Sequence, residues 1–258
     1  MILHARSTKL TTSSNAFFVT VRPLARGEIH LWRARVTDAQ VEACRPLLSA
    51  EERTRAARFR FARDQRMATV SRGLRRRLLA EYIGVVPEAL RFDVGPQGKP
   101  RLAGASDVEF NVSHSGDLVV FAFSRSGAVG VDVEKIDATR DLLGMARVSF
   151  SAFEQRELER LEIPRRCEAF HRAWAQKEAF IKWIGMGVQY PLTAFDVSVD
   201  PEKPVELLAV RHDAPGVTPN TSPDTRQCVL SRIAVGGEFA GALATDGHPD
   251  SMHLFDAL

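Results

Sequence analysis

The order of strand and helix patterns repeats once along this chain of 258 residues, and that order restricts the fold more than any single motif. Short apolar strands and a long helical stretch at residues 49–82 occupy the first half. Strands and a helical stretch at residues 165–184 occupy the second half. This recurrence favours an α+β fold with two lobes of similar size. Because the turn residues between the halves fall near residues 124–128, we expect an N-terminal lobe at residues 1–126 and a C-terminal lobe at residues 127–258.

Composition excludes several classes of protein. An apolar share of 45% can fill a core, and a net charge of +3 means that any binding of anions must come from local patches. No stretch approaches the roughly 18 apolar residues that a membrane span needs. Three widely spaced cysteines, Cys44, Cys167 and Cys228, form no CxxC pair. We therefore expect a cytoplasmic protein that neither forms disulfides nor enters a membrane.

A pair of carboxylates marks the strand expected at residues 129–133. Because side chains alternate along a strand, the valines at 129, 131 and 133 face one way, and Asp132 and Glu134 face the other. Two carboxylates on one face repel each other unless a cation or a proton lies between them, and such oxygen ligands suit Mg²⁺. The alternative is the solvated face of an amphipathic strand.

The second long helix carries a polar stripe. Trp174, Glu178 and Lys182 follow one another at intervals of one helical turn, so they share a face. Phe170, Ala173, Phe180 and Ile184 supply an apolar face for the core. A simple surface ion pair would also explain Glu178 and Lys182.

Small polar residues follow the strand expected at residues 108–112. Ser113, His114, Ser115 and Gly116 permit close approach of an anion. A serine hydrolase is a poor match, because adjacent Ser and His cannot easily adopt a triad geometry and no GxSxG elbow is present. The remaining alternative is the corner of a hairpin.

The first long helical stretch is strongly basic. Its arginines between residues 53 and 77 face a single acid, Asp64. These arginines are Arg53, Arg55, Arg58, Arg60, Arg63, Arg66, Arg72, Arg75, Arg76 and Arg77. Arginine binds phosphate directly, but a basic helix also suits nucleic acid, and a solvated basic face needs no ligand at all. Neither a Walker loop nor GxGxxG accompanies the segment.

Taken together, these motifs resemble one family, the 4'-phosphopantetheinyl transferases, and specifically the large two-lobed type that activates peptide synthetases and polyketide synthases. The resemblance rests on N-V-S-H-S-G at residues 111–116, G-V-D-V-E at residues 130–134, and W-A-Q-K-E-A-F-I-K at residues 174–182 followed by Gly185 and Gly187. The Gly98-Lys99-Pro100 turn also matches. The matching region spans roughly residues 49–191.

The resemblance implies two similar α+β lobes related by a pseudo-twofold, each a small, mostly antiparallel sheet packed with a long helix. Coenzyme A would bind in the cleft between them. Asp132, Glu134 and Glu178 would hold Mg²⁺ against the pyrophosphate of coenzyme A. Glu178 is the candidate base, and Asp132 and Lys182 complete the expected catalytic set.

The resemblance also implies residues that contact coenzyme A. They are Lys99, Ser113, His114, Lys177 and Lys182. Glu52 stands where relatives carry a basic contact, so Arg53 or Arg55 is expected to substitute for it.

The expected reaction moves the phosphopantetheine arm of coenzyme A to a serine of an apo acyl or peptidyl carrier protein and releases 3',5'-ADP. The large members of the family complete a site within one chain, so we expect a monomer that binds neither nucleic acid nor membranes. A nucleic-acid-binding protein built on the basic helix is the alternative, and it would not need the three acids. A catalytically silent carrier-binding module is a third reading, against which the intact acid set argues.

Overall fold

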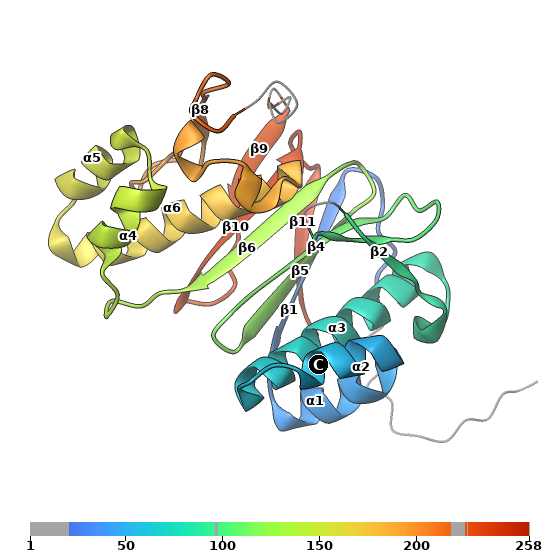
Figure 1. Ribbon diagram of the computed structural model, residues 1–258. Coiled ribbons are helices and arrows are strands. Elements are labelled where there is room, and N and C mark those ends of the chain that lie inside the picture. Colours follow the sequence, from blue (N-terminus) through green and yellow to red (C-terminus); the bar gives the residue numbers. More distant parts are fainter. Residues whose placement is uncertain (1–20, 96–97, 218–224, 226, 258) are drawn as a thin grey trace, which may run out of the picture.

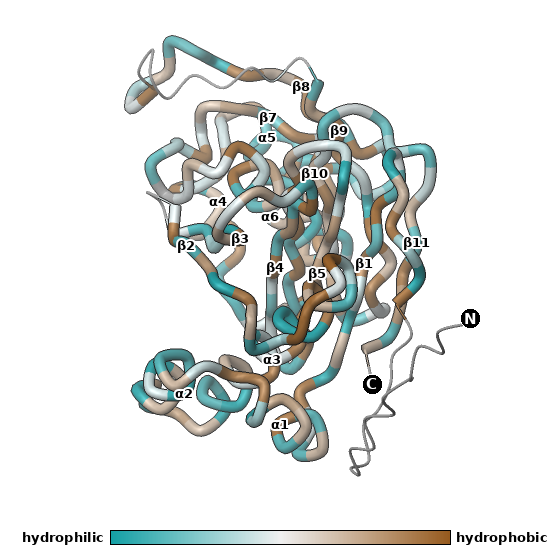
Figure 2. Tube along the Cα trace, turned by 90° about the vertical axis from the view of Figure 1, so that its right-hand side faces the viewer, coloured by the Kyte–Doolittle hydropathy of each residue, from teal (hydrophilic) through white to brown (hydrophobic). Residues whose placement is uncertain are grey.

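The computed structural model describes residues 21–95, 98–217, 225 and 227–257. Two sheets pack against each other, and a long helix covers the outer side of each (Figure 1). The helices of the first half and those of the second half lie at opposite ends of the molecule with the strands between them, as a view turned by 90° also shows (Figure 2). This arrangement of helices and small, mainly antiparallel sheets confirms the expected α+β fold.

The first sheet has four strands in the order β11-β1-β5-β4. Its strands are β1 (Glu28–Arg35), β4 (Glu109–Ser115), β5 (Leu118–Ser124) and β11 (Ser251–Asp256). All pairs are antiparallel except β1 with β11, which run parallel. The last strand therefore returns to the first sheet, although the expected division had assigned it to residues 127–258. Pairing with β11 covers the edge of β1, which would otherwise be open.

The second sheet has three antiparallel strands in the order β6-β10-β9. They are β6 (Val129–Lys135), β9 (Cys228–Arg232) and β10 (Phe239–Asp246). Two small antiparallel pairs complete the strands, namely β2 (Phe92–Val94) with β3 (Pro100–Leu102) and β7 (Phe195–Val197) with β8 (Leu207–Val210). The turn of the first pair carries the Gly-Lys-Pro motif. A further strand pattern at residues 17–21 lies almost wholly outside the described residues.

Six helices are described. They are α1 (Asp38–Cys44), α2 (Ala50–Ala57), α3 (Ala62–Ile83), α4 (Leu142–Ser149), α5 (Ala152–Arg160) and α6 (Ile163–Ile184). Short 3-10 turns lie at Arg45–Leu47, Pro87–Ala89, Gly187–Gln189 and Leu192–Ala194. The stretch expected as one helix at residues 49–82 breaks at residues 58–61, because Glu52 of α2 pairs with Arg75 and Arg76 of α3 and holds the shorter helix against the longer one.

The two halves repeat one arrangement. In each, a short helix begins with a Ser-x-x-Glu capping box, formed by Ser49 with Glu52 and by Ser151 with Glu154. In each, a helix of 22 residues follows and ends at a left-handed glycine. The buried glutamate of the short helix pairs with a cation of the long one, Arg76 in α3 and Lys177 in α6. The halves are therefore similar in construction, while their relation by a pseudo-twofold stays a prediction.

Close contact between α6 and β6 depends on Gly130. An ideal Cβ at this position would lie 2.1 Å from the carbonyl oxygen of Ala179 and 2.4 Å from the amide nitrogen of Trp183. Only a residue without a Cβ permits this approach of helix and strand. The valines of β6 face the core between the two sheets, as the strand pattern predicted, so Asp132 points from the opposite face toward α6.

Replacing Gly130 by Ala should push α6 away from β6. We expect Gly130→Ala to lower the free energy of unfolding by about 1–3 kcal/mol, since an added methyl group there overpacks a closed contact. Urea unfolding measures this change. Gly237→Ala is the control, because a Cβ at Gly237 would meet nothing within 4 Å. Equal stability of the two variants would contradict the close approach.

Candidate active site

The edges of the two sheets meet where β4 runs beside β6. Three side chains of β4 on the same face reach backbone amides of β6. Asn111 Oδ1 accepts from Val131 N at 2.9 Å, Ser113 Oγ from Val133 N at 3.3 Å, and Ser115 Oγ from Lys135 N at 3.0 Å. We call Asn111, Ser113 and Ser115 the polar seam. It satisfies donors on the edge of β6 and aligns both strands at the candidate site.

Asp132 lies at the centre of the site and is only 3% exposed. Its Oδ1 accepts from Ser113 Oγ at 2.8 Å and from Lys182 Nζ at 2.6 Å. Its Oδ2 is buried and has no hydrogen-bond partner among the described residues. Burial raises the pKa of this carboxyl, while the Lys182 ammonium opposes the rise. An unpaired buried carboxylate oxygen is costly unless a proton or a cation reaches it.

Glu134 and Glu178 adjoin this carboxylate. Burial raises the pKa of both, and repulsion from Asp132 raises both further. Ser115 Oγ donates to Glu134 Oε2 at 3.0 Å. The three interacting carboxylates outnumber the two cations that act on them, Lys182 and, at Glu134, Arg140. The remaining negative charge favours a divalent cation.

The three expected metal ligands do not form a complete protein cage. Among the residues that the structure describes, no three His, Cys, Asp or Glu side chains gather as a metal site. Like charges separate, and Lys182 already holds one oxygen of Asp132. Magnesium commonly takes only one or two carboxylates and fills its remaining positions with water and phosphate oxygens. The free Oδ2 of Asp132 fits that kind of site, so the metal role of these acids remains a proposal.

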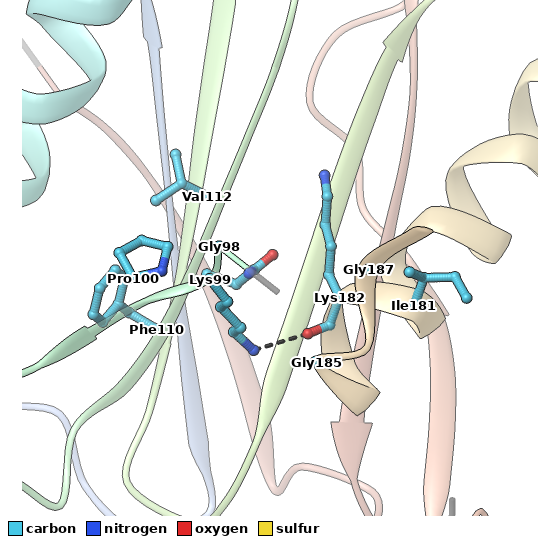
Figure 3. A pocket seen from close by; sticks show the side chains of 10 residues that line it. Gly98, Lys99, Pro100, Phe110, Val112, Ile181, Lys182, Gly185 and Gly187 are labelled. Carbon is cyan, nitrogen blue, oxygen red and sulfur yellow. Dashed lines mark hydrogen bonds between the residues drawn. The ribbon is translucent and has the colours of Figure 1, made fainter. Parts of the chain in front are cut away.

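Lys99 links the two halves instead of standing free in the cleft. Its Nζ donates to the carbonyl of Lys182 at 2.8 Å and to that of Val129 at 3.1 Å (Figure 3). The first carbonyl belongs to the last turn of α6, where a cation is favoured. Burial lowers the pKa of Lys99 to about 8. Figure 3 shows the side chain of Lys182 running away from Lys99 along β6.

Two cavities adjoin these residues and share Pro100 and Val112 in their linings. The smaller, of about 250 Å³, lies between the Gly-Lys-Pro turn and the end of α6 and includes Lys99 and Lys182. The larger, of about 640 Å³, has a basic lining. Its charged and titratable members are Arg63, Asp64, Arg72, Arg75, His114 and Arg140. The larger volume falls in the range of ligand pockets, and its arginines suit phosphates.

The structure brings only some of the expected coenzyme A residues to this cleft. His114 lines the basic cavity, and Lys99 and Lys182 line the smaller one. Arg53 and Arg55 line neither: Arg53 donates to the carbonyl of Leu48, and Arg55 pairs with Glu51. Arg63, Arg72 and Arg75 of the same basic segment line the cavity instead. Arg140, from the loop after β6, was not singled out from the sequence, where its position six residues beyond Glu134 was the available signal.

Lys177 does not reach the cleft, so its expected place near the phosphates is wrong. Its side chain is fully buried and donates to Glu154 Oε1, Glu154 Oε2 and the carbonyl of Phe195 at 2.6–2.7 Å. All three ammonium hydrogens are thereby used. Burial lowers the pKa of Lys177 to about 8. The residue holds α6 to α5 and β7 within its own half.

Two family models and several known proteins match this chain. The family model for the N-terminal part of 4'-phosphopantetheinyl transferases matches residues 31–126, and the model for the 4'-phosphopantetheinyl transferase superfamily matches residues 128–228. The 4'-phosphopantetheinyl transferase psf-1 of Bacillus pumilus is 35% identical over 80% of this chain and 88% of its own length. HetI of Nostoc sp., also named as such a transferase, is 33% identical over 71% of this chain and 79% of its own length.

A third relative is the 4'-phosphopantetheinyl transferase Sfp of Bacillus subtilis, 30% identical over 62% of this chain and 70% of its own length. The chain belongs to the 4'-phosphopantetheinyl transferase family. Within the family it is of the large, Sfp-like type. It is an enzyme that transfers the phosphopantetheine group of coenzyme A to carrier proteins.

The nucleic-acid alternative finds no support. Part of the basic segment serves the fold, since Arg75 and Arg76 neutralise Glu52 and Arg66 pairs with Asp38. None of the helices in the described part of the chain is long and apolar enough to cross a membrane.

Lys99→Met tests the role of the linking lysine. Because Lys99 Nζ binds two backbone carbonyls, we expect the variant to weaken coenzyme A and dephospho-coenzyme A by the same factor in calorimetric titrations. Lys203→Met, which removes an exposed lysine, is the control. A charged hydrogen bond to the 3'-phosphate would instead make the loss about tenfold or more greater for coenzyme A, and that result would contradict the linking role.

Lys177→Met should act on stability. Removal of one partner leaves Glu154 buried without its counter-ion, so we expect a loss of about 3–5 kcal/mol in urea unfolding. Adding Glu154→Gln should recover part of that loss, because no buried charge then remains unpaired while a side-chain oxygen can still accept from the amides of Ser151 and Val197. Weaker binding of coenzyme A at unchanged stability would place Lys177 in the site after all.

Proposed function

We propose that this chain catalyses a Mg²⁺-dependent transfer from coenzyme A to the hydroxyl of a serine in an apo acyl or peptidyl carrier protein, with release of 3',5'-ADP. The observation that carries the proposal is the buried Asp132 with its unpaired Oδ2, beside Glu134, Glu178 and Lys182. Ser115, which bonds Glu134, lines the basic cavity. This is an arrangement for a polyanion and a divalent cation together.

The acids and the lysine have separate tasks in this proposal. Asp132, Glu134 and Glu178 would hold the cation, which when bound supplies Lewis-acid stabilisation of the pyrophosphate oxygens. Lys182, whose side chain is 26% exposed, would offset charge that develops on the leaving phosphate.

Glu178 is the proposed general base. Its pKa is raised by burial and by Asp132, which brings the carboxylate closer to the strength that removal of a proton near neutral pH requires. No nucleophile of the enzyme takes part, since the carrier serine attacks the pantetheine phosphate directly and 3',5'-ADP leaves.

The cavity orients coenzyme A before attack. Arg63, Arg72 and Arg75 from α3 and Arg140 from the other half would bind its phosphates, together with His114 of the same lining. Because one chain supplies both walls, we propose that the monomer is active. A cytoplasmic location is proposed with it, in keeping with three free cysteines.

The direct test of the function is incubation of the protein with coenzyme A, Mg²⁺ and a panel of apo carrier proteins. Intact-mass analysis should show addition of one phosphopantetheine arm to at least one carrier, and a chelator should stop it. Addition that continues at full rate in the chelator would refute the dependence on Mg²⁺.

Replacing a single one of the proposed metal-binding acids should lower the rate of phosphopantetheine transfer strongly. We expect Glu178→Gln or Asp132→Asn to lower the rate of transfer by about 10²-fold or more, because neutralisation and alignment of the phosphates fail together. Since the acids act as a unit, the double variant should cost little more than the worse single one. Glu81→Gln makes the same chemical change on the exposed side of α3 and serves as control. A fully active Glu178→Gln variant would refute the assignment.

A further inference from the structure

The polar seam contacts more than the backbone of β6. Two of its three members also bind the side chain of the β6 residue that precedes the bonded amide. Ser113 bonds Val133 N and the carboxylate of Asp132, and Ser115 bonds Lys135 N and the carboxylate of Glu134. Asn111 differs, because it bonds Val131 N and reaches no carboxylate. One row of side chains thus joins the sheets and touches both acids of the strand.

The chemistry of a hydroxyl fixes the direction of these bonds. A serine hydroxyl has one hydrogen to donate and two lone pairs that accept. Ser113 Oγ accepts from Val133 N and from Lys182 Nζ, so its hydrogen is directed to Asp132 Oδ1. Ser115 Oγ accepts from Lys135 N and directs its hydrogen to Glu134 Oε2. Each carboxylate is therefore held by one oxygen in a fixed rotation.

The fixed rotation of the Asp132 carboxylate determines which of its two oxygens is free to bind a cation. Because Oδ1 is held by Ser113 and Lys182, Oδ2 is the oxygen that is left buried and unpaired. Donors that orient ligating carboxylates contribute to metal affinity although they never touch the metal.

We propose that Ser113 and Ser115 are positioning residues that orient Asp132 and Glu134 toward a divalent cation. They act through the two carboxylates and need not touch the cation themselves. This role differs from the expected contact of Ser113 with coenzyme A. It rests on the proposed Mg²⁺-dependent function, and it assigns part of the serine-rich motif to the metal.

The test is binding of Mn²⁺ alone to the full chain, followed by electron paramagnetic resonance and repeated with saturating coenzyme A. Ser115→Ala and Ser113→Ala should each weaken Mn²⁺ by roughly 10- to 100-fold, as loss of orienting partners does elsewhere. Ser115→Thr should restore the affinity, because it keeps the hydroxyl. The half-saturating Mg²⁺ concentration for transfer should rise in the alanine variants.

Asn111→Ala is the matched control, since it removes a seam bond without loosening a carboxylate. Ser124→Ala removes a buried hydroxyl whose contact is the amide of Ser126. Both should bind Mn²⁺ alone as the original protein does. If the serine variants lose only thermal stability and keep their Mn²⁺ affinity, the seam is structural and the proposal is wrong. The binding assay needs no carrier, so an absence of transfer would overturn the proposed function and leave this result interpretable.

Discussion

The structure depends on how the buried carboxylate of Asp132 is stabilised where the edge strands β4 and β6 of the two sheets meet. Asp132 is 3% exposed, and the Ser113 hydroxyl and the Lys182 ammonium offset the loss of hydration at its Oδ1. That compensation requires β4 beside β6 and α6 close upon β6, so the seam and Gly130 are consequences of the same requirement. The two cavities adjoin this junction, since Val112 of β4 lines both of them.

Buried carboxylates paired with cations occur in both halves, but they have different roles at different places. In each, a glutamate from a short capped helix is buried and fully paired with a cation of the long helix, and the pair holds the helices together. At the active site the balance is left incomplete, because the carboxylates outnumber the ammonium of Lys182 and Asp132 retains an unpaired oxygen. Buried pairs that are closed stabilise an arrangement, whereas an open one attracts a cation. The fully paired glutamates therefore stabilise the helices, whereas the incompletely paired Asp132 belongs to the candidate active site.

Local patterns in the sequence predicted local features well. Alternation along the strand correctly placed the valines of β6 in a core and Asp132 on the opposite face. Contacts between distant segments could not be predicted from the sequence. No local pattern in residues 251–256 indicates parallel pairing with β1. The break between α2 and α3 follows from an ion pair between residues distant in sequence. Lys177 was misplaced although helical spacing sets it between Ala173 and Phe180 on the apolar stripe, so its burial was visible in the periodicity. The motif at residues 111–116 was singled out from the sequence, but its bonds to β6 could not be predicted, because they depend on the register of two strands from different sheets.

The central claim is that the acids of β6 and α6 bring a divalent cation to the pyrophosphate of coenzyme A within this cleft. Phosphorus NMR of coenzyme A on the protein, with Mn²⁺ added in small steps, measures that proximity directly. We expect the pyrophosphate resonances to broaden strongly and the 3'-phosphate resonance to broaden much less, and we expect Asp132→Asn to abolish the difference. Equal broadening of all three phosphates, or a pattern unchanged in Asp132→Asn, would contradict it.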